Sequence, residues 1–225
     1  MQQGNHLDLD FSVSCATFHP TCRKVEIQYL SLQKLIESVS ADLEQQYLDE
    51  KSRFEQAEKN AKDASGEDDI LYQYLYDKNC SPIDGFLNDL FDIQNMFYQS
   101  MLSTVFSFYE SILTLIVVEK QLGDRKKPID ALKERVYRKL QSNVQKDFDY
   151  LNDDVRHIRN IIVHNYNGTP TNAQKIAAQT ETEQKRGFAM YNQDSYTIEK
   201  RYVLFVLDKE YWVLRAICKE LGYRD

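Results

Sequence analysis

The chain has little of what loop-rich, secreted or metal-binding proteins use. It has only 7 Gly and 4 Pro in 225 residues, which argues against a loop-rich or all-β fold, because turns and hairpins depend on these residues. Its 4 Cys include Cys15 and Cys22, which flank His19, but the six residues between the two Cys are not a usual zinc spacing and no second pair follows. We therefore expect free thiols, no metal and no cofactor, as in a reducing compartment.

The chain also lacks the pattern of a signal peptide or a membrane span. Its first residues contain no basic stretch followed by an apolar one. The most apolar run, residues 105–118, is interrupted by Tyr109, Glu110 and several hydroxyl side chains, and it is too short to cross a bilayer. The sequence thus predicts a cytoplasmic protein that does not associate with a membrane, with residues 105–118 in a buried core helix.

Basic residues are fewer than acidic ones, 28 against 35, and the charges are unevenly distributed along the chain. The net charge of −7 does not favour a general nucleic-acid binder. Residues 120–146, however, contain nine basic and three acidic side chains, whereas residues 41–69 are strongly acidic. The basic segment permits a local contact with phosphate. A solvated helix face would explain the same segment equally well.

Apolar residues at three- and four-residue steps predict an all-α protein. We expect long helices over residues 23–64, 84–122 and 128–163, the last with a break near Ser142 or Asp147, and a short helix over 70–76. A small β-hairpin, with strands over 188–191 and 196–205, precedes a final helix over 208–221. The predicted fold is an up-and-down helical bundle. Residues 1–80 form an N-terminal extension that packs on the bundle, and residues 81–225 form the helical domain.

The most informative stretch is residues 159–166, with the sequence Arg-Asn-Ile-Ile-Val-His-Asn-Tyr, at the end of the predicted 128–163 helix. At 100° per residue, Ile158 and Ile162 face the core. Arg159, Asn160 and His164 lie along one polar flank, with Asn160 and His164 stacked four residues apart. A permanent cation, an amide and an imidazole are therefore expected together at a helix end.

These three side chains suit cleavage of RNA without a metal. The 2′-hydroxyl of RNA can act as the nucleophile, so the enzyme needs a base, an acid and positive charge at the phosphorus. His164 can transfer the proton, Arg159 can stabilise the developing charge, and Asn160 can orient the imidazole or a phosphate oxygen. One His does not easily serve as acid and base together, whereas a symmetric dimer brings two copies to one site.

The pattern Arg159-Asn160-x-x-x-His164 resembles the signature of the HEPN superfamily of small helical proteins, many of them metal-independent ribonucleases. Residues 106–113 also resemble the aromatic and acidic stretch of the preceding core helix in that family, and the resemblance covers residues 85–222. It implies a homodimer in which both motifs line a shared cleft, and an endoribonuclease that acts as a toxin or a defence or stress effector. Arg159, His164 and Asn160 would form the catalytic group.

Three further residues are candidates for supporting roles. Tyr166 extends the match to Arg-x4-His-x-Tyr, which resembles HEPN toxins whose nucleotidyltransferase antitoxin modifies the Tyr, so an antitoxin or regulatory partner is implied. Glu110 lies in the middle of an apolar helix, where a charge is costly unless it is paired, and we expect it to reach Arg156 or Arg159. The alternative function is a non-catalytic, HEPN-like dimer that binds another protein or RNA, with acidic residues 41–69 as its docking surface.

Overall fold

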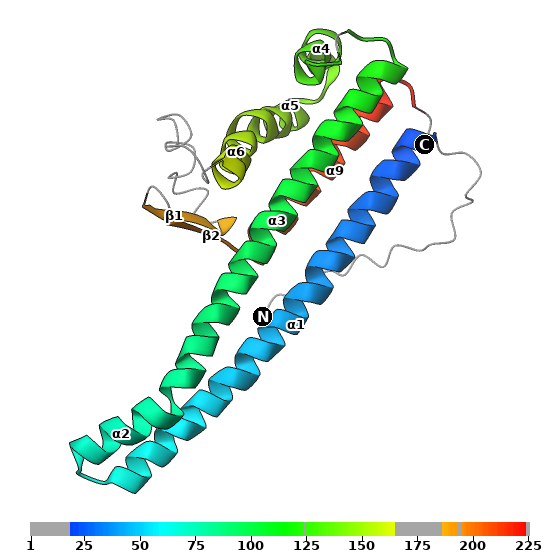
Figure 1. Ribbon diagram of the computed structural model, residues 1–225. Coiled ribbons are helices and arrows are strands. Elements are labelled where there is room, and N and C mark those ends of the chain that lie inside the picture. The colour runs from blue at the N-terminus through cyan, green and yellow to red at the C-terminus, as the bar shows by residue number, and fades with distance from the viewer. Residues whose placement is uncertain (1–18, 124, 165–185, 193–194, 224–225) are drawn as a thin grey trace.

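The computed structural model describes residues 19–123, 125–164, 186–192 and 195–223. Figure 1 shows a bundle of long helices with a single small hairpin at its side. The predicted all-α class, the bundle architecture and the hairpin before the last helix are confirmed.

Helix α1 (Pro20–Ser65) and helix α3 (Ser81–Glu119) run antiparallel along the length of the molecule (Figure 1). The Nδ1 atom of His19 accepts a hydrogen bond from the backbone of Thr21 and caps α1. Gly66, with φ of 58°, ends the helix. Asp68 then caps the short helix α2 (Asp69–Asn79), which connects the two long helices.

Helix α9 (Lys200–Glu220) packs against the N-terminal half of α1 and the C-terminal half of α3, and these two halves also pack against each other. Their core is made of buried aliphatic and aromatic side chains, mostly from the second half of α3. Helix α3 is the one described helix long and apolar enough to span a membrane, and 56% of its most apolar window is buried inside the protein. A core helix of a soluble protein has the same composition, so this feature is weak support for a membrane span.

The lower halves of α1 and α3, together with α2, project beyond the rest of the molecule (Figure 1). We call residues 41–97 the arm. Residues 41–60 of α1 contain no buried side chain, α2 contains none, and Leu90 is the only buried residue between Ser81 and Phe97. The helices of the arm therefore pack on one another without a further layer.

The predicted helix over 128–163 is divided in the structure. Helix α4 (Pro128–Arg135) is followed by a 3₁₀ turn, and helix α5 (Ser142–Tyr150) then begins, so the expected break near Ser142 is confirmed. Helix α5 does not break at residues 147–148. It continues instead through a π-helical turn over residues 151–155 into helix α6 (Arg156–His164). The motif thus lies at the end of a helix that contains one wide turn.

Strands β1 (Phe188–Asn192) and β2 (Ser195–Ile198) pair antiparallel, with Phe188 opposite Ile198. The side chain of Asn95 accepts a hydrogen bond of 3.0 Å from the backbone of Ile198 and ties the hairpin to α3. The second strand ends earlier than predicted, because residues 200–207 are helical. Tyr202, Val203, Val206 and Leu207 are buried at three- and four-residue spacing, which is a helical rather than an alternating pattern.

Candidate functional site

Helix α6 packs its apolar side against α3 and leaves a polar side that carries the motif. Ile158, Ile161 and Ile162 are buried, whereas Arg156 and Val163 are exposed. The predicted orientation of Ile158 and Ile162 toward the core is confirmed. Such one-sided burial is expected of an amphipathic surface helix. It leaves the residues between the isoleucines at the boundary between core and solvent.

The structure brings Arg159 and Asn160 together at this boundary. Both side chains are half-buried. Nη1 of Arg159 donates a hydrogen bond of 3.0 Å to Oδ1 of Asn160. The bond orients the guanidinium through a neighbouring amide rather than through a carboxylate, so the positive charge of Arg159 is not neutralised by this contact.

One donor of Arg159 is left without an acceptor. Its Nε atom is buried, and no atom within the described ranges accepts a hydrogen bond from it. A buried donor of a charged group costs about 1–3 kcal/mol or more when it is unpaired, so buried donors generally have partners. Water, a ligand or a residue outside the described ranges can supply the acceptor for this nitrogen.

The remaining motif residues can be placed only in part. His164 is the last residue of α6, four positions after Asn160, so the two residues share one side of the helix. The side chain of His164 and the whole of Tyr166 lie outside the described residues. The predicted stacking of Asn160 and His164 therefore rests on the course of the backbone.

Glu110 does not reach the motif. Among the described residues it forms no ion pair with Arg156 or Arg159, so the expected contact is wrong. The negative charge of its carboxylate instead contributes to the raised pKa of Glu210 on α9 and of Tyr109, its own neighbour in α3. Arg156 is exposed, and any contribution from it to the site would come from the solvent side of α6.

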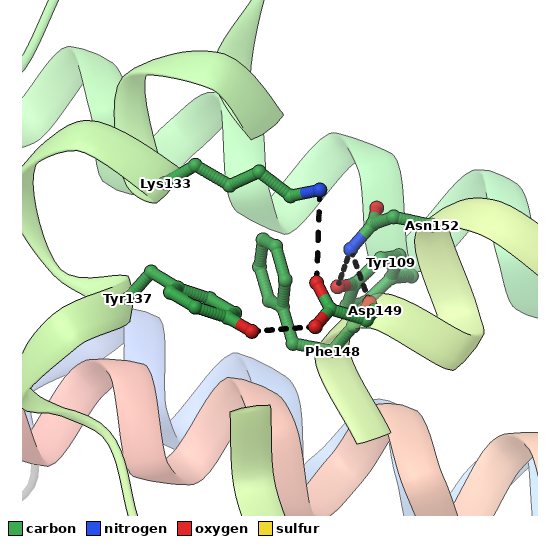
Figure 2. Close-up of polar contacts among 6 residues, drawn as sticks. All are labelled: Tyr109, Lys133, Tyr137, Phe148, Asp149 and Asn152. Atoms are coloured by element: carbon green, nitrogen blue, oxygen red, sulfur yellow. Dashed lines mark hydrogen bonds and ion pairs between the residues drawn. The ribbon is translucent and has the colours of Figure 1, made fainter. Parts of the chain in front are cut away.

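A polar cluster that the sequence did not reveal lies inside the bundle, just before α6. Figure 2 shows Asn152, in the π-helical turn, between Tyr109 of α3 and the backbone of Phe148. Its Nδ2 atom donates hydrogen bonds of 3.1 Å to the Tyr109 hydroxyl and 2.7 Å to the Phe148 carbonyl. Burial raises the pKa of the Tyr109 hydroxyl, which remains protonated.

The cluster continues outward from this turn. The Tyr137 hydroxyl donates a hydrogen bond to Oδ2 of Asp149, and Nζ of Lys133 lies 3.6 Å from Oδ1 of the same carboxylate (Figure 2). These contacts join the α4 region to α5, while Asn152 joins the π turn to α3. Wide turns of this kind often occur near functional sites. Here the turn sets the direction of α6 and hence of the motif.

Glu210 is a second buried polar group that sequence reasoning missed. It is 1% exposed on α9, and neither carboxyl oxygen has a hydrogen-bond partner among the described residues. Burial and then the charge of Glu110 raise the pKa of Glu210 well above its ordinary value. Both causes favour the neutral acid over the carboxylate. Its position in the apolar stripe of residues 206, 207, 213 and 214 was the available sequence signal.

No metal site accompanies these groups in the described part of the chain, which holds no cluster of three or more His, Cys, Asp or Glu residues suited to a cation. Comparison with protein-family models, curated proteins and solved structures gives no match for this chain. The function must therefore be argued from the motif and from the geometry of α6.

Proposed function

We propose that the protein is a metal-independent endoribonuclease of the HEPN type. The observation that carries this proposal is the state of Arg159, which is held by Asn160 and has a buried Nε without a partner in the described residues. A phosphate is a suitable acceptor, because the guanidinium fork matches two of its oxygens. The orientation by an amide supports the proposal, since it leaves the full charge of Arg159 for the substrate.

The proposed reaction divides the work among three residues. A base removes the proton of the 2′-hydroxyl, the 2′-oxygen attacks the phosphorus, and the bond from phosphorus to the 5′-oxygen breaks as that oxygen gains a proton. The products are a 2′,3′-cyclic phosphate and a 5′-hydroxyl. His164 transfers a proton, Arg159 stabilises the charge on the phosphorane, and Asn160 positions Arg159.

Two proton transfers on opposite sides of the phosphorus favour a homodimer. A two-fold axis near the end of α6 would place His164 of each copy at one phosphate. Support comes from Val163, which is 41% exposed directly before His164 and offers apolar surface there. The biological role that we propose is that of a cytoplasmic toxin or defence effector restrained by an antitoxin or another regulatory protein.

The proposal is tested by single-turnover cleavage of RNA with variants of the motif. We expect Arg159→Ala to slow cleavage by about a hundredfold to a thousandfold, because it removes charge from the transition state. Arg159→Lys should restore only part of the rate, since Lys lacks the planar fork. Asn160→Ala should have a smaller effect, and Lys59→Ala, at an exposed position of the arm, serves as the control. Equal rates for all four proteins would refute the assignment of Arg159.

Expression in cells gives an independent test. Wild-type protein should arrest growth, and His164→Ala should relieve the arrest. The control is His157→Ala, which removes the other histidine of α6 and should leave the arrest in place. Relief by both variants would mean that the effect does not depend on the proposed proton transfer.

The alternative function is a non-catalytic module that binds a protein or RNA, and the arm is the observation that favours it. Large apolar side chains are exposed along all three of its helices: Tyr47, Leu48, Ile70, Leu71, Tyr74, Phe86, Phe91, Ile93 and Met96. Exposed apolar surface of this kind commonly marks an interaction site. A folded dimer that cleaves no RNA and that retains a bound partner through the arm would favour this function over the first.

A further inference from the structure

The only Trp of the chain is exposed on the surface of α9. Trp212 is 61% exposed, although Val213 and Leu214, the next two residues, are buried at 1% and 0%. A large aromatic ring that is not used in the core is a strong candidate for contact with a ligand, since burying it against an apolar partner gains more than burying most other side chains.

Two tyrosines form an aromatic platform next to Trp212. Trp212 packs edge-on against Tyr211, with ring centres 5.2 Å apart. Tyr211 in turn stacks on Tyr29 of α1 at 4.3 Å. The Tyr29 hydroxyl donates a hydrogen bond of 2.6 Å to Asp208. The aromatic platform beside Trp212 is therefore fixed by contacts between α1 and α9.

Trp212 also lines an open hollow of about 570 Å³ between α5 and α9. Gln141, Asn143, Arg215 and Lys219 line the same hollow and offer hydrogen-bond donors. Nη1 of Arg215 donates a hydrogen bond of 3.0 Å to the Tyr211 hydroxyl, which fixes the guanidinium beside the aromatic platform. The hollow thus combines an aromatic face with two cations.

The cations around the hollow outnumber the acids by one, because Arg215, Lys219 and Lys209 lie there with Asp147 and Glu220. Asp147, on the wall of the hollow, is paired with Lys209 at 2.8 Å. Lining residues 140, 141, 143 and 144 belong to the basic segment 120–146, although none of the nine cations of that segment is among the lining residues. This small excess of positive charge permits the phosphates of an anionic ligand to bind beside the exposed ring.

We propose that this hollow binds single-stranded RNA, with a base stacked on Trp212 and phosphates on Arg215 and Lys219. The choice of RNA rests on the proposed function. Stacking on an aromatic ring together with backbone contact to cations is the general mode of single-strand recognition. The hollow and the motif lie on one continuous helical run, about 30 Å apart along its axis, so the hollow would hold a part of the strand that is not being cut.

Because Trp212 is the sole Trp, its fluorescence reports on this hollow alone. The experiment titrates the non-cleaving His164→Ala protein with a single-stranded RNA of about 12 nucleotides, and in parallel with inorganic polyphosphate of similar charge. We expect saturable quenching by RNA and little quenching by polyphosphate, because the polyphosphate has no base to stack.

Affinity is then measured by the fluorescence anisotropy of end-labelled RNA. Trp212→Ala should weaken binding by about five- to a hundredfold, and Trp212→Phe by less, since a smaller ring remains. Lys219→Ala should weaken binding and lower the salt dependence by about one ion. The control is Lys59→Ala, an exposed lysine of the arm, which should bind as the parent protein does.

Several results would overturn the proposal: quenching by polyphosphate equal to that by RNA, RNA binding without quenching, or unchanged affinity of Trp212→Ala. A shift of the fluorescence with protein concentration alone, together with a dimer that Trp212→Ala dissolves, would instead assign this face to a second copy of the chain. Quenching without any RNA cleavage by the wild type would retain this site and reject the ribonuclease. Cleavage without quenching would support the ribonuclease and reject this site.

Discussion

The bundle and the arm are built from the same two helices, and they differ in what covers them. Along α3, twelve side chains are buried, and all except Leu90 lie at or beyond Tyr98. Helix α9 packs against that part of α3, since Ile198, just before α9, is bonded to Asn95, and Tyr223, just after it, is bonded to Glu119. The arm has apolar residues of similar size, such as Phe86 and Phe91, but they are about half exposed. An apolar stripe therefore becomes a core only where a third helix reaches it.

The largest expected difference between the two regions is in how much a Leu→Ala substitution lowers the free energy of unfolding. Leu102 is 0% exposed in the bundle, whereas Leu48 is 57% exposed in the arm. We expect Leu102→Ala to lower the free energy of unfolding by about 2–5 kcal/mol and Leu48→Ala to change it by less than about 0.5 kcal/mol. Urea denaturation of both variants measures this difference. Similar losses would mean that a further layer covers the arm in solution.

The paired polar cluster of the bundle should have the next largest effect. Asn152→Ala removes both hydrogen bonds of the side chain and leaves the Tyr109 hydroxyl without its donor, whereas the Phe148 carbonyl keeps the hydrogen bond from the backbone N–H of Leu151. We expect a loss of about 1–3 kcal/mol. Asn143→Ala, an exposed position on α5, is the matched control. If both variants were equally stable, the cluster would not anchor the π turn.

Replacing Glu210, which has no hydrogen-bond partner among the described residues, should stabilise the protein rather than destabilise it. Its folded-state pKa is raised above the unfolded value, so the folded state binds more protons and stability falls as pH rises between the two values. Glu210→Gln removes this dependence, so it should raise the free energy of unfolding near neutral pH and have a smaller effect at acid pH, where both states of the wild type bind the proton.

Thermal melts across this pH range test the prediction for Glu210. Glu55→Gln, at an exposed position of the arm, should leave the pH profile unchanged. A Glu210→Gln protein with the same pH profile as the wild type would show that Glu210 has a partner in solution.

The smallest effect on stability is expected at the tip of the arm. Ile70 of α2 is 84% exposed, so Ile70→Glu should alter the free energy of unfolding by less than about 0.5 kcal/mol. If the arm is an interaction surface, the same change should abolish binding of the partner, as measured by co-purification. A loss of stability without a loss of partner would contradict both statements.

Most helices were predictable because they depend on local patterns. Pro82 separates α2 from α3, and the apolar spacing of α3 and α6 places the correct sides in the core. The start of α9 was missed because a short β-branched and aromatic run, residues 202–206, suits both strand and helix. Tertiary packing against α3 decides for the helix.

The candidate site was predictable only along its own helix. The side-by-side placement of Arg159 and Asn160 follows from sequence, but the unpaired Nε depends on burial that only the fold defines. The π turn and Asn152 left no clear pattern, since Asn-Asp-Asp at 152–154 looks like a polar interruption. Glu110 was assigned to the motif because partners across helices cannot be read from one helix alone.

We propose above all that the motif at the end of α6 cleaves RNA without a metal. The most direct test incubates RNA with the wild type and with His164→Ala in the presence of EDTA and maps the product ends. We expect cleavage by the wild type alone, with 2′,3′-cyclic phosphate and 5′-hydroxyl ends. Products with 3′-hydroxyl ends, cleavage that EDTA abolishes, or equal cleavage by His164→Ala would contradict it.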